Sequence, residues 1–258
     1  MASELSVAVV IPALNEEHGL PRTLSTVAGQ VPKPEEVVVV DAGSEDRTAE
    51  VARAGGAQVL ASRRGRAWQM NAGARTTKAE VLIFLHADTE LPEGAVAAVR
   101  AALADASVLG GCFQLRFDTQ TQSRALQLWS WCTSCWLLRS TRLVFGDRAI
   151  FVRRSAFEGL DGYREWPLLE DIDFAMRLAK RGGGDKSFAF LPLAVTTSAR
   201  RLLEVGPWKQ QLVNTSIIIA WYLGYSPETL KAWYKNRAAP IAAAASAPPA
   251  IRKVQGQD

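Results

Sequence analysis

Long hydrophobic runs are missing from this 258-residue sequence. No run reaches the roughly 18 consecutive apolar residues that a membrane-spanning helix requires. The nearest, residues 217–223, is followed at once by Gly224. Residues 1–6 carry no basic cluster, and the apolar run at 7–11 is too short for the core of a signal peptide. We therefore expect a cytoplasmic protein, with peripheral contact to the inner face of the membrane as an alternative.

Cysteine is also scarce, with three residues at positions 112, 132 and 135. The Cys132-x-x-Cys135 spacing occurs in redox and metal motifs, but no second Cys or His cluster lies nearby. The pair lies instead in an apolar, Trp-rich stretch. We interpret the three cysteines as packing thiols of a protein in a reducing compartment, and a redox or metal pair is the alternative.

Strong charge of one sign is absent as well, because the net charge is only +4. So small a surplus does not predict nucleic-acid binding, although it suits a phosphate-bearing ligand or an anionic membrane surface. The first apolar run is not followed by Gly-x-Gly-x-x-Gly, and no Gly-x-x-x-x-Gly-Lys-Ser/Thr occurs. These absences argue against a dinucleotide enzyme and a P-loop NTPase.

Short apolar runs alternate with helical patterns over the first hundred residues. We expect strands at 7–11, 36–41, 58–60 and 81–85, and helices at 20–30, 44–54, 65–74 and 92–104. Because these strands are apolar throughout, both faces of their sheet should be covered. The alternation predicts an α/β fold with a mainly parallel, Rossmann-like sheet covered by helices.

The second half of the chain has longer spacings between its elements. We expect strands at 108–117 and 188–195, a loop that runs into a strand at 145–152, and helices at 123–138, 170–181, 207–223 and 227–237. Residues 238–258 are rich in Ala and Pro, have nothing to bury and are expected to be disordered. The pattern predicts one domain over residues 5–237.

Carboxylates follow three of the expected strands. Glu16 comes shortly after Pro12, Asp41 ends the second strand, and Asp88 follows the strand at 81–85. Ligands of open parallel sheets bind beyond the carboxyl ends of the strands, so these residues should surround one nucleotide-sized site. A carboxylate at the second strand commonly binds a ribose or base edge, and a later one suits a divalent metal on a diphosphate. The alternative for Asp88 is a helix N-cap.

The expected helix at 170–181 separates two carboxylates by their phase. Asp171 shares a face with Phe174 and Leu178, so it should point inward, and a buried carboxylate needs a reason. A general base facing a cleft is one reason, and stabilisation by the helix N-terminus is the alternative. Asp173 and Arg177 are spaced i, i+4 and should form a solvent-exposed ion pair.

Arginine and tryptophan carry two further hypotheses. Arg66 opens an expected helix beside Gly65, where it either binds phosphate or is an ordinary solvated side chain. Trp129, Trp131 and Trp136 are spread around one expected helix. We interpret these three as core residues, and an acceptor platform or membrane contact is the alternative.

Four of these segments together resemble a known family. They are residues 11–16 (Ile-Pro-Ala-Leu-Asn-Glu), 40–48 (Val-Asp-Ala-Gly-Ser-Glu-Asp-Arg-Thr), 85–88 (Leu-His-Ala-Asp) and 169–171 (Leu-Glu-Asp). In order and in kind they resemble the motifs of family-2 nucleotide-sugar glycosyltransferases of GT-A fold, over most of residues 5–205. The phrases at 65–73, 146–151 and 197–201 resemble a short, single-domain bacterial subgroup that is often labelled as arsenosugar-type.

The resemblance implies a role for each motif. Pro12, Glu16 and Asp41 would contact the nucleoside, Asp88 would bind a Mn²⁺ or Mg²⁺ ion on the diphosphate, and Asp171 would be the base.

Two motifs depart from the family pattern. His86 replaces the first Asp of Asp-x-Asp, so it either ligates the metal, with a preference for Mn²⁺, or does not touch it. Gln-x-x-Arg-Trp is absent, and Arg200 and Arg201 with Trp208 would serve the same end on the donor.

The resemblance thus implies an inverting transfer of a sugar from a nucleotide-diphosphate donor, such as a UDP-sugar, to a hydroxyl acceptor. Residues 5–105 would bind the nucleotide sugar, and residues 106–237 would form a smaller acceptor and catalytic half. A nucleotidyltransferase and a non-catalytic nucleotide-sugar binding protein remain the alternatives.

Overall fold

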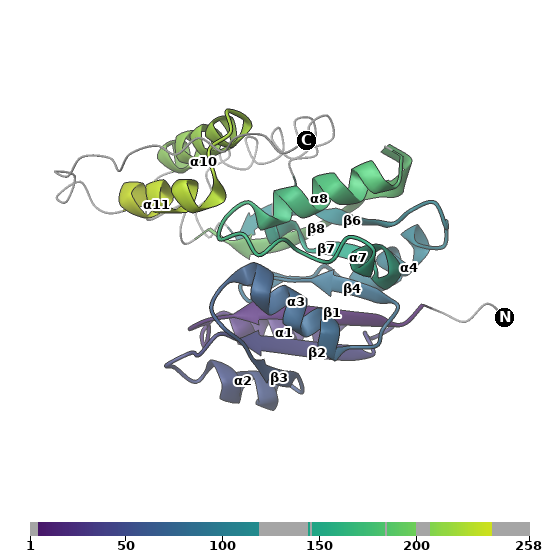
Figure 1. Cartoon of the computed structure of the whole chain (residues 1–258). Coiled ribbons are helices and arrows are strands. Elements are labelled where there is room, and N and C mark those ends of the chain that lie inside the picture. The colour runs from purple at the N-terminus through teal and green to yellow at the C-terminus, as the bar shows by residue number, and fades with distance from the viewer. Residues whose placement is uncertain (1–4, 119–143, 145, 184, 200–206, 239–258) are drawn as a thin grey trace. The chain divides into compact units, whose positions relative to one another are not determined.

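The computed structural model describes residues 5–118, 144, 146–183, 185–199 and 207–238 (Figure 1). The chain divides into two compact units: residues 1–165 with 170–198, and residues 166–169 with 199–258. Several predicted residues lie outside the described ones: Cys132, Cys135, Trp129, Trp131, Trp136, Arg200, Arg201 and the tail from 239. Cys112 is a buried thiol of the first unit, as expected for a packing cysteine.

The first unit is built on one sheet, which has eight strands among the described residues. The strands are β1 (Val7–Ala13), β2 (Glu36–Asp41), β3 (Gln58–Ala61), β4 (Val81–Phe84), β5 (Thr89–Glu90), β6 (Gly110–Asp118), β7 (Ile150–Arg153) and β8 (Phe188–Ser198). Their order is β3-β2-β1-β4-β7-β6-β8-β5. The first four are parallel, β6 and β8 are parallel, and β7 and β5 run antiparallel to their neighbours. The expected α/β fold with a mainly parallel sheet is confirmed.

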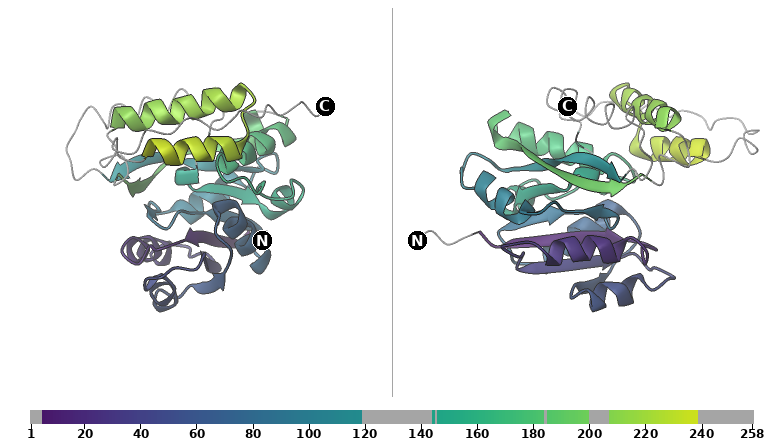
Figure 2. Two further views of the ribbon diagram at one scale, coloured as in Figure 1. Left: turned by 60° about the vertical axis from the view of Figure 1, so that its left-hand side comes forward. Right: turned by 180° about the vertical axis from the view of Figure 1, so that it is seen from behind.

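Both faces of this sheet are covered, which explains why its central strands are apolar throughout. One face packs on α1 (Leu20–Ala28), α2 (Thr48–Ala54) and α4 (Ala95–Ala102), and the other on α3 (Arg66–Thr76), α7 (Arg154–Glu158) and α8 (Glu170–Arg181) (Figures 1 and 2). Along β1, Val9 joins the first core and Val10 the second, and both are fully buried. The alternation of successive side chains between the two faces therefore builds two cores from one run.

Helix α3 lies unusually close to the sheet because of Gly73. A Cβ atom at this position would come within 2.4 Å of Val10 Cγ1 and 2.9 Å of Val40 Cγ2. Such distances are well inside van der Waals contact, so only glycine allows this approach. The close packing holds the N-terminal turn of α3 beside the carboxyl ends of β1 and β2.

The segment after β4 differs from the expectation. Residues 89 and 90 form β5, which pairs with Thr196 and Thr197 of β8. The next helix, α4, begins only at Ala95, and its N-cap is Gly94. The alternative in which Asp88 caps a helix is therefore wrong, because a strand intervenes.

The second unit contains α10 (Pro207–Tyr222) and α11 (Pro227–Ala238), close to the expected bounds. Gly224, with φ of +88°, lies in the turn between them. Trp166 packs edge-on against Trp221, with ring centroids 6.4 Å apart, and Lys231 Nζ donates a 3.1 Å hydrogen bond to the carbonyl oxygen of Pro167. Among the helices that the structure describes, none is long and apolar enough to cross a membrane.

Candidate active site

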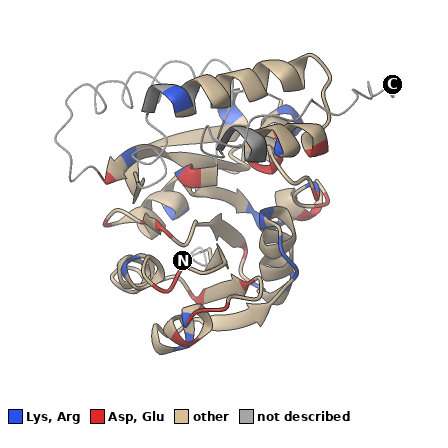
Figure 3. Ribbon diagram, turned by 90° about the vertical axis from the view of Figure 1, so that its left-hand side faces the viewer, with Lys and Arg blue, Asp and Glu red and all other residues tan. Residues whose placement is uncertain are grey.

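The strand ends that the sequence singles out meet at one edge of the first unit. Ala13 pairs with Asp41 at the carboxyl ends of β1 and β2. Phe84 pairs with Ile150 in antiparallel fashion, so the residues just after β4 lie beside those just before β7. Figure 3 looks onto this edge, around which acidic and basic segments gather.

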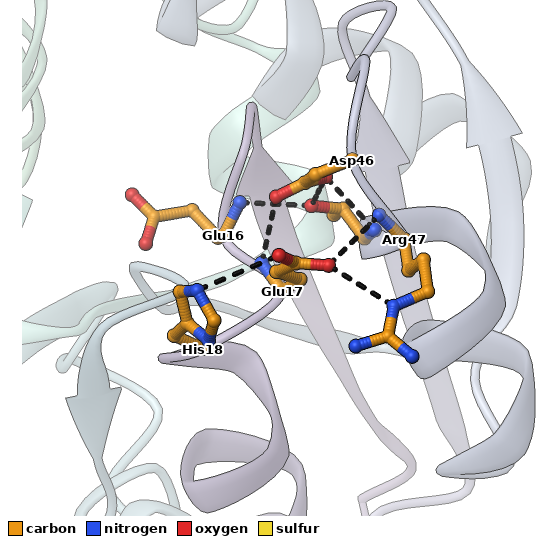
Figure 4. Close-up of polar contacts among 6 residues, drawn as sticks. Glu16, Glu17, His18, Asp46 and Arg47 are labelled. Carbon is orange, nitrogen blue, oxygen red and sulfur yellow. Dashed lines mark hydrogen bonds and ion pairs between the residues drawn. The ribbon is translucent and has the colours of Figure 1, made fainter.

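The loop after β1 is locked to the loop after β2 (Figure 4). The backbone N–H of Glu16 donates to Thr48 Oγ1 at 2.8 Å, and that of Glu17 donates to Asp46 Oδ2 at 3.1 Å. In return, Arg47 Nε donates to Glu17 Oε2 at 3.3 Å. The Glu16 carboxylate points away from these contacts (Figure 4). These contacts fix the backbone that carries Glu16 just after the carboxyl end of β1.

Asp41 is held at the end of β2 by Ser44. The Ser44 hydroxyl donates to Asp41 Oδ1, and its backbone N–H donates to Oδ2 at 3.2 Å. The same hydroxyl accepts the N–H of Asn15 at 2.9 Å. The helix expected from residue 44 begins only at Thr48, and its N-cap, Arg47, makes no side-chain hydrogen bond. Ser44 instead orients the half-buried carboxylate of Asp41.

Gln69 is a site residue that the sequence analysis missed. Its side-chain Nε2 donates to the carbonyl oxygens of Ala13 at 2.9 Å and of Val40 at 2.8 Å. The side chain is buried and comes from α3, so it links the carboxyl ends of β1 and β2 by hydrogen bonds from one face of the sheet. No periodic pattern in the sequence marks it, because the buried residues of α3 include a second polar side chain, that of Asn71.

Asp88 and His86 are half-buried residues of the loop between β4 and β5. The loop is anchored by the N–H of Ser198, which donates to the carbonyl oxygen of Asp88 at 3.2 Å. The hydroxyl of Thr89 lies 3.4 Å from Asp88 Oδ1. Within the described part of the chain, no group of three His, Cys, Asp or Glu side chains would hold a metal by itself.

Asp171 lies in the first turn of α8 and is 7% exposed. The backbone N–H of Gly146 donates to its Oδ2 at 3.1 Å, whereas its Oδ1 has no hydrogen-bond partner among the described residues. Burial raises the pKa of Asp171 to about 8, with the charges of Glu170 and Asp147 adding to the rise and that of Arg66 opposing it. The inward orientation predicted from helical phase is confirmed.

Arg66 reaches this carboxylate pair from α3. Its Nε lies 3.5 Å from Glu170 Oε1, and the Glu170 side chain is only 5% exposed. The Arg66 side chain is 43% exposed, so it also contacts solvent. This arrangement brings a positive charge to the place where Asp171 is buried.

Asp173 is buried, so the expectation of a solvent-exposed ion pair with Arg177 is wrong. Its side chain is 6% exposed and binds Arg177 at 2.7 Å and Arg164 at 3.0 Å. Arg177 also donates to the carbonyl oxygens of Leu160 at 2.8 Å and Gly162 at 2.9 Å. The i, i+4 pair therefore exists, but the segment before α8 covers it, and helical phase alone does not reveal such a cover.

Asp147 and Arg148 are further residues to which the sequence analysis gave no role. They belong to the short 3₁₀ helix η2 (Gly146–Arg148), directly before β7. Burial raises the pKa of Asp147, the charges of Arg148 and Arg66 oppose this rise, and the charge of Asp88 adds to it. Asp147 is therefore in electrostatic reach of both Asp88 and Asp171.

Solved structures resemble this fold at low sequence identity. Glucosyl-3-phosphoglycerate synthase from Mycobacterium tuberculosis, in complex with Mn²⁺, UDP and phosphoglyceric acid, is 20% identical with a TM-score of 0.59, covering 91% of this chain and 78% of that one. TarS from S. aureus is 16% identical with a TM-score of 0.58, covering 90% and 71%. At this identity the likeness shows the fold alone, which is the expected GT-A fold.

Curated relatives match over shorter segments. A 4,4'-diaponeurosporenoate glycosyltransferase from Staphylococcus haemolyticus is 40% identical over 94 residues, which are 33% of this chain and 25% of that protein. An undecaprenyl-phosphate 4-deoxy-4-formamido-L-arabinose transferase from Aeromonas hydrophila is 34% identical over 134 residues, 47% of this chain and 41% of that protein. The chain thus spans less than half the length of these relatives.

The sequence model described as Glycosyl transferase family 2 matches residues 8–160, which is more than half of the chain and includes β1 to β7. As the four motifs indicated, the chain belongs to glycosyl transferase family 2.

Proposed function

We propose that this protein is an inverting glycosyltransferase that moves a sugar from a UDP-sugar to a hydroxyl acceptor. The observation that carries this proposal is Asp171, a buried carboxylate with a raised pKa beside the edge where Asp41 and Asp88 lie. A buried carboxylate is costly for stability, and a catalytic role accounts for that cost. Residues 5–105 bind the donor in this proposal, and residues 106–237 receive the acceptor.

The donor lies across the carboxyl ends of the strands. Asp41 is oriented by Ser44 and binds the ribose or the base edge. Pro12 and Glu16 line the same side, since the loop after β1 is locked to the loop after β2. Arg66 lies at the N-terminus of α3 and contributes a cation and backbone N–H groups to the diphosphate. Arg200 and Arg201 remain donor-binding candidates outside the described residues.

A divalent cation, Mn²⁺ or Mg²⁺, fits this arrangement. Such ions are commonly held by one or two carboxylates, with diphosphate oxygens and water completing the shell. Asp88 supplies a hard oxygen ligand, and the lack of a three-residue cluster among the described residues agrees with a metal that arrives on the nucleotide. His86 is the second candidate ligand. When bound, the ion neutralises charge on the leaving diphosphate.

Asp171 then acts on the acceptor. Its Oδ2 is held by Gly146, which leaves Oδ1 to accept the proton of the attacking hydroxyl. The hydroxyl oxygen attacks the anomeric carbon from the face opposite the diphosphate, so the configuration inverts. A pKa raised to about 8 suits a general base in that the carboxylate takes a proton more readily than an ordinary one does.

Release of UDP from a panel of UDP-hexoses tests this proposal. Wild-type protein with Mn²⁺ should release UDP slowly by hydrolysis in the absence of acceptor, and faster when hydroxyl-bearing acceptors are added. Asp161→Asn is the matched control for Asp171→Asn, because both are Asp-to-Asn changes in the same unit and Asp161 is exposed. A nucleotidyltransferase would instead release pyrophosphate from nucleoside triphosphates, and a binding protein would release nothing; either result contradicts the proposal.

A further inference from the structure

The short helix η2 places Asp147 between the segments that carry the two ends of the proposed reaction centre. Gly146, directly before it, donates its N–H to Asp171, and a Cβ atom at Gly146 would lie 2.4 Å from Asp171 Oδ2. Ile150, which follows η2 closely, pairs with Phe84 at the end of β4, so η2 lies beside the loop that carries Asp88. Asp147 thus stands near the proposed base and near the proposed diphosphate site.

Any donor sugar must occupy the space between those two groups. Its anomeric carbon is bonded to the diphosphate, and the attacking oxygen approaches that carbon from the side of the base. A residue whose charge acts on both Asp88 and Asp171 is therefore a candidate to contact the sugar ring.

Asp147 also has an unmet hydrogen-bonding capacity. Its Oδ1 is shielded from solvent and has no hydrogen-bond partner among the described residues. A buried acceptor without a donor costs free energy, so such an atom in a site indicates a missing ligand. The charges of Arg148 and Arg66 already act on this carboxylate. A neutral hydroxyl donor therefore complements it better than a further cation.

We propose that Asp147 binds hydroxyl groups of the transferred sugar and selects the donor by its hydroxyl pattern. The proposal rests on the proposed function, since it concerns the sugar of the same donor. A carboxylate accepts hydrogen bonds from two neighbouring hydroxyls, and such charge-assisted bonds are among the stronger polar contacts. A donor that lacks one of these hydroxyls leaves the carboxylate unsatisfied, which discriminates strongly.

Calorimetric titration with two probes tests this assignment. In Mn²⁺, Asp147→Ala should bind the best UDP-hexose roughly 10- to 100-fold more weakly than wild type does. Its affinity for UDP, which carries no sugar, should stay within about twofold. Glu93→Ala is the control for an exposed acidic residue of the same unit. Asp147→Asn keeps the shape of the side chain and serves if the Ala variant does not fold, with a smaller loss expected.

Deoxy donors make the test specific. One UDP-deoxyhexose should bind wild type more weakly than its parent, yet bind Asp147→Ala as well as its parent does. An equal loss of UDP and UDP-hexose affinity would identify Asp147 as a metal or diphosphate ligand and overturn the proposal. Unchanged UDP-hexose affinity, or a wild type that binds no sugar nucleotide more tightly than UDP, overturns it too. A wild type that does not bind UDP at all contradicts the proposed function itself.

Discussion

The backbone N–H of Gly146 and the carboxylate of Asp171 are 3.1 Å apart, although 25 residues separate them in the chain. A side chain at position 146 would collide with that carboxylate, because a Cβ atom would come within 2.4 Å of Oδ2. Glycine is therefore required for the start of η2 to contact the start of α8. This contact fixes one oxygen of Asp171 and directs the other away from Gly146.

Asp88→Ala should remove the gain in UDP affinity that Mn²⁺ provides, by about tenfold or more. Asp88 is a half-buried loop residue, so the variant should fold and melt close to the wild-type temperature. Calorimetry with and without Mn²⁺ measures the effect, and Glu93→Ala provides an exposed acidic control five residues away. An unchanged response to Mn²⁺ would rule out Asp88 as the metal ligand.

Asp173→Asn should lower the free energy of unfolding by about 1.5–3 kcal/mol, the range for hydrogen bonds to charged groups. The reason is that Asp173 is buried between Arg164 and Arg177, and its loss leaves Arg177 without its buried counter-charge. Urea unfolding of this variant and of Asp161→Asn measures the difference. A loss below about 0.5 kcal/mol, as for an exposed pair, would mean that the segment before α8 does not cover Asp173 in solution.

The buried carboxylate of Asp171 should make stability depend on pH. Its native pKa is raised to about 8, whereas the unfolded chain titrates at about 3.9. The native state therefore keeps a proton that the unfolded state releases, so the stability contributed below about pH 4 is lost as pH rises toward 8. Asp171→Asn lacks this titration.

Thermal unfolding from about pH 5 to about pH 9 measures this pH dependence of stability. The melting temperature of Asp171→Asn, relative to wild type, should rise from about pH 5 to about pH 8 and then level off. The exposed control Asp161→Asn should show a constant difference. A constant difference for Asp171→Asn as well would mean that its pKa is not raised.

Local patterns in the sequence were sufficient for the described strands other than β5, and for the inward face of α8. Val9 and Val10 lie in an apolar run because helices cover both sides of β1. Phe174 and Leu178 are fully buried, and they lie on the same inward face of α8 as Asp171. In each case the signal and the structure depend on neighbours along the same segment.

Contacts between distant segments were not predictable in the same way. Asp173 is buried by residues around Leu160 and Gly162, whose fold over α8 has no periodic signal. Asp147 reaches the site because β7 runs antiparallel to β4, and a short apolar strand does not reveal its direction. The motif at 146–151 was visible in the sequence, but its place beside Asp171 depends on that pairing.

Turnover by two neighbouring variants tests the central claim, that Asp171 is the general base, most directly. Asp171→Asn keeps the shape of the side chain but removes the basic oxygen, so kcat should fall by roughly 10²–10⁴-fold while affinity for the UDP-sugar stays near wild type. Asp173→Asn, assayed well below its melting temperature, should retain kcat within about threefold, because its carboxylate binds two arginines rather than substrate. An Asp171→Asn enzyme that turns over at the wild-type rate would contradict this account.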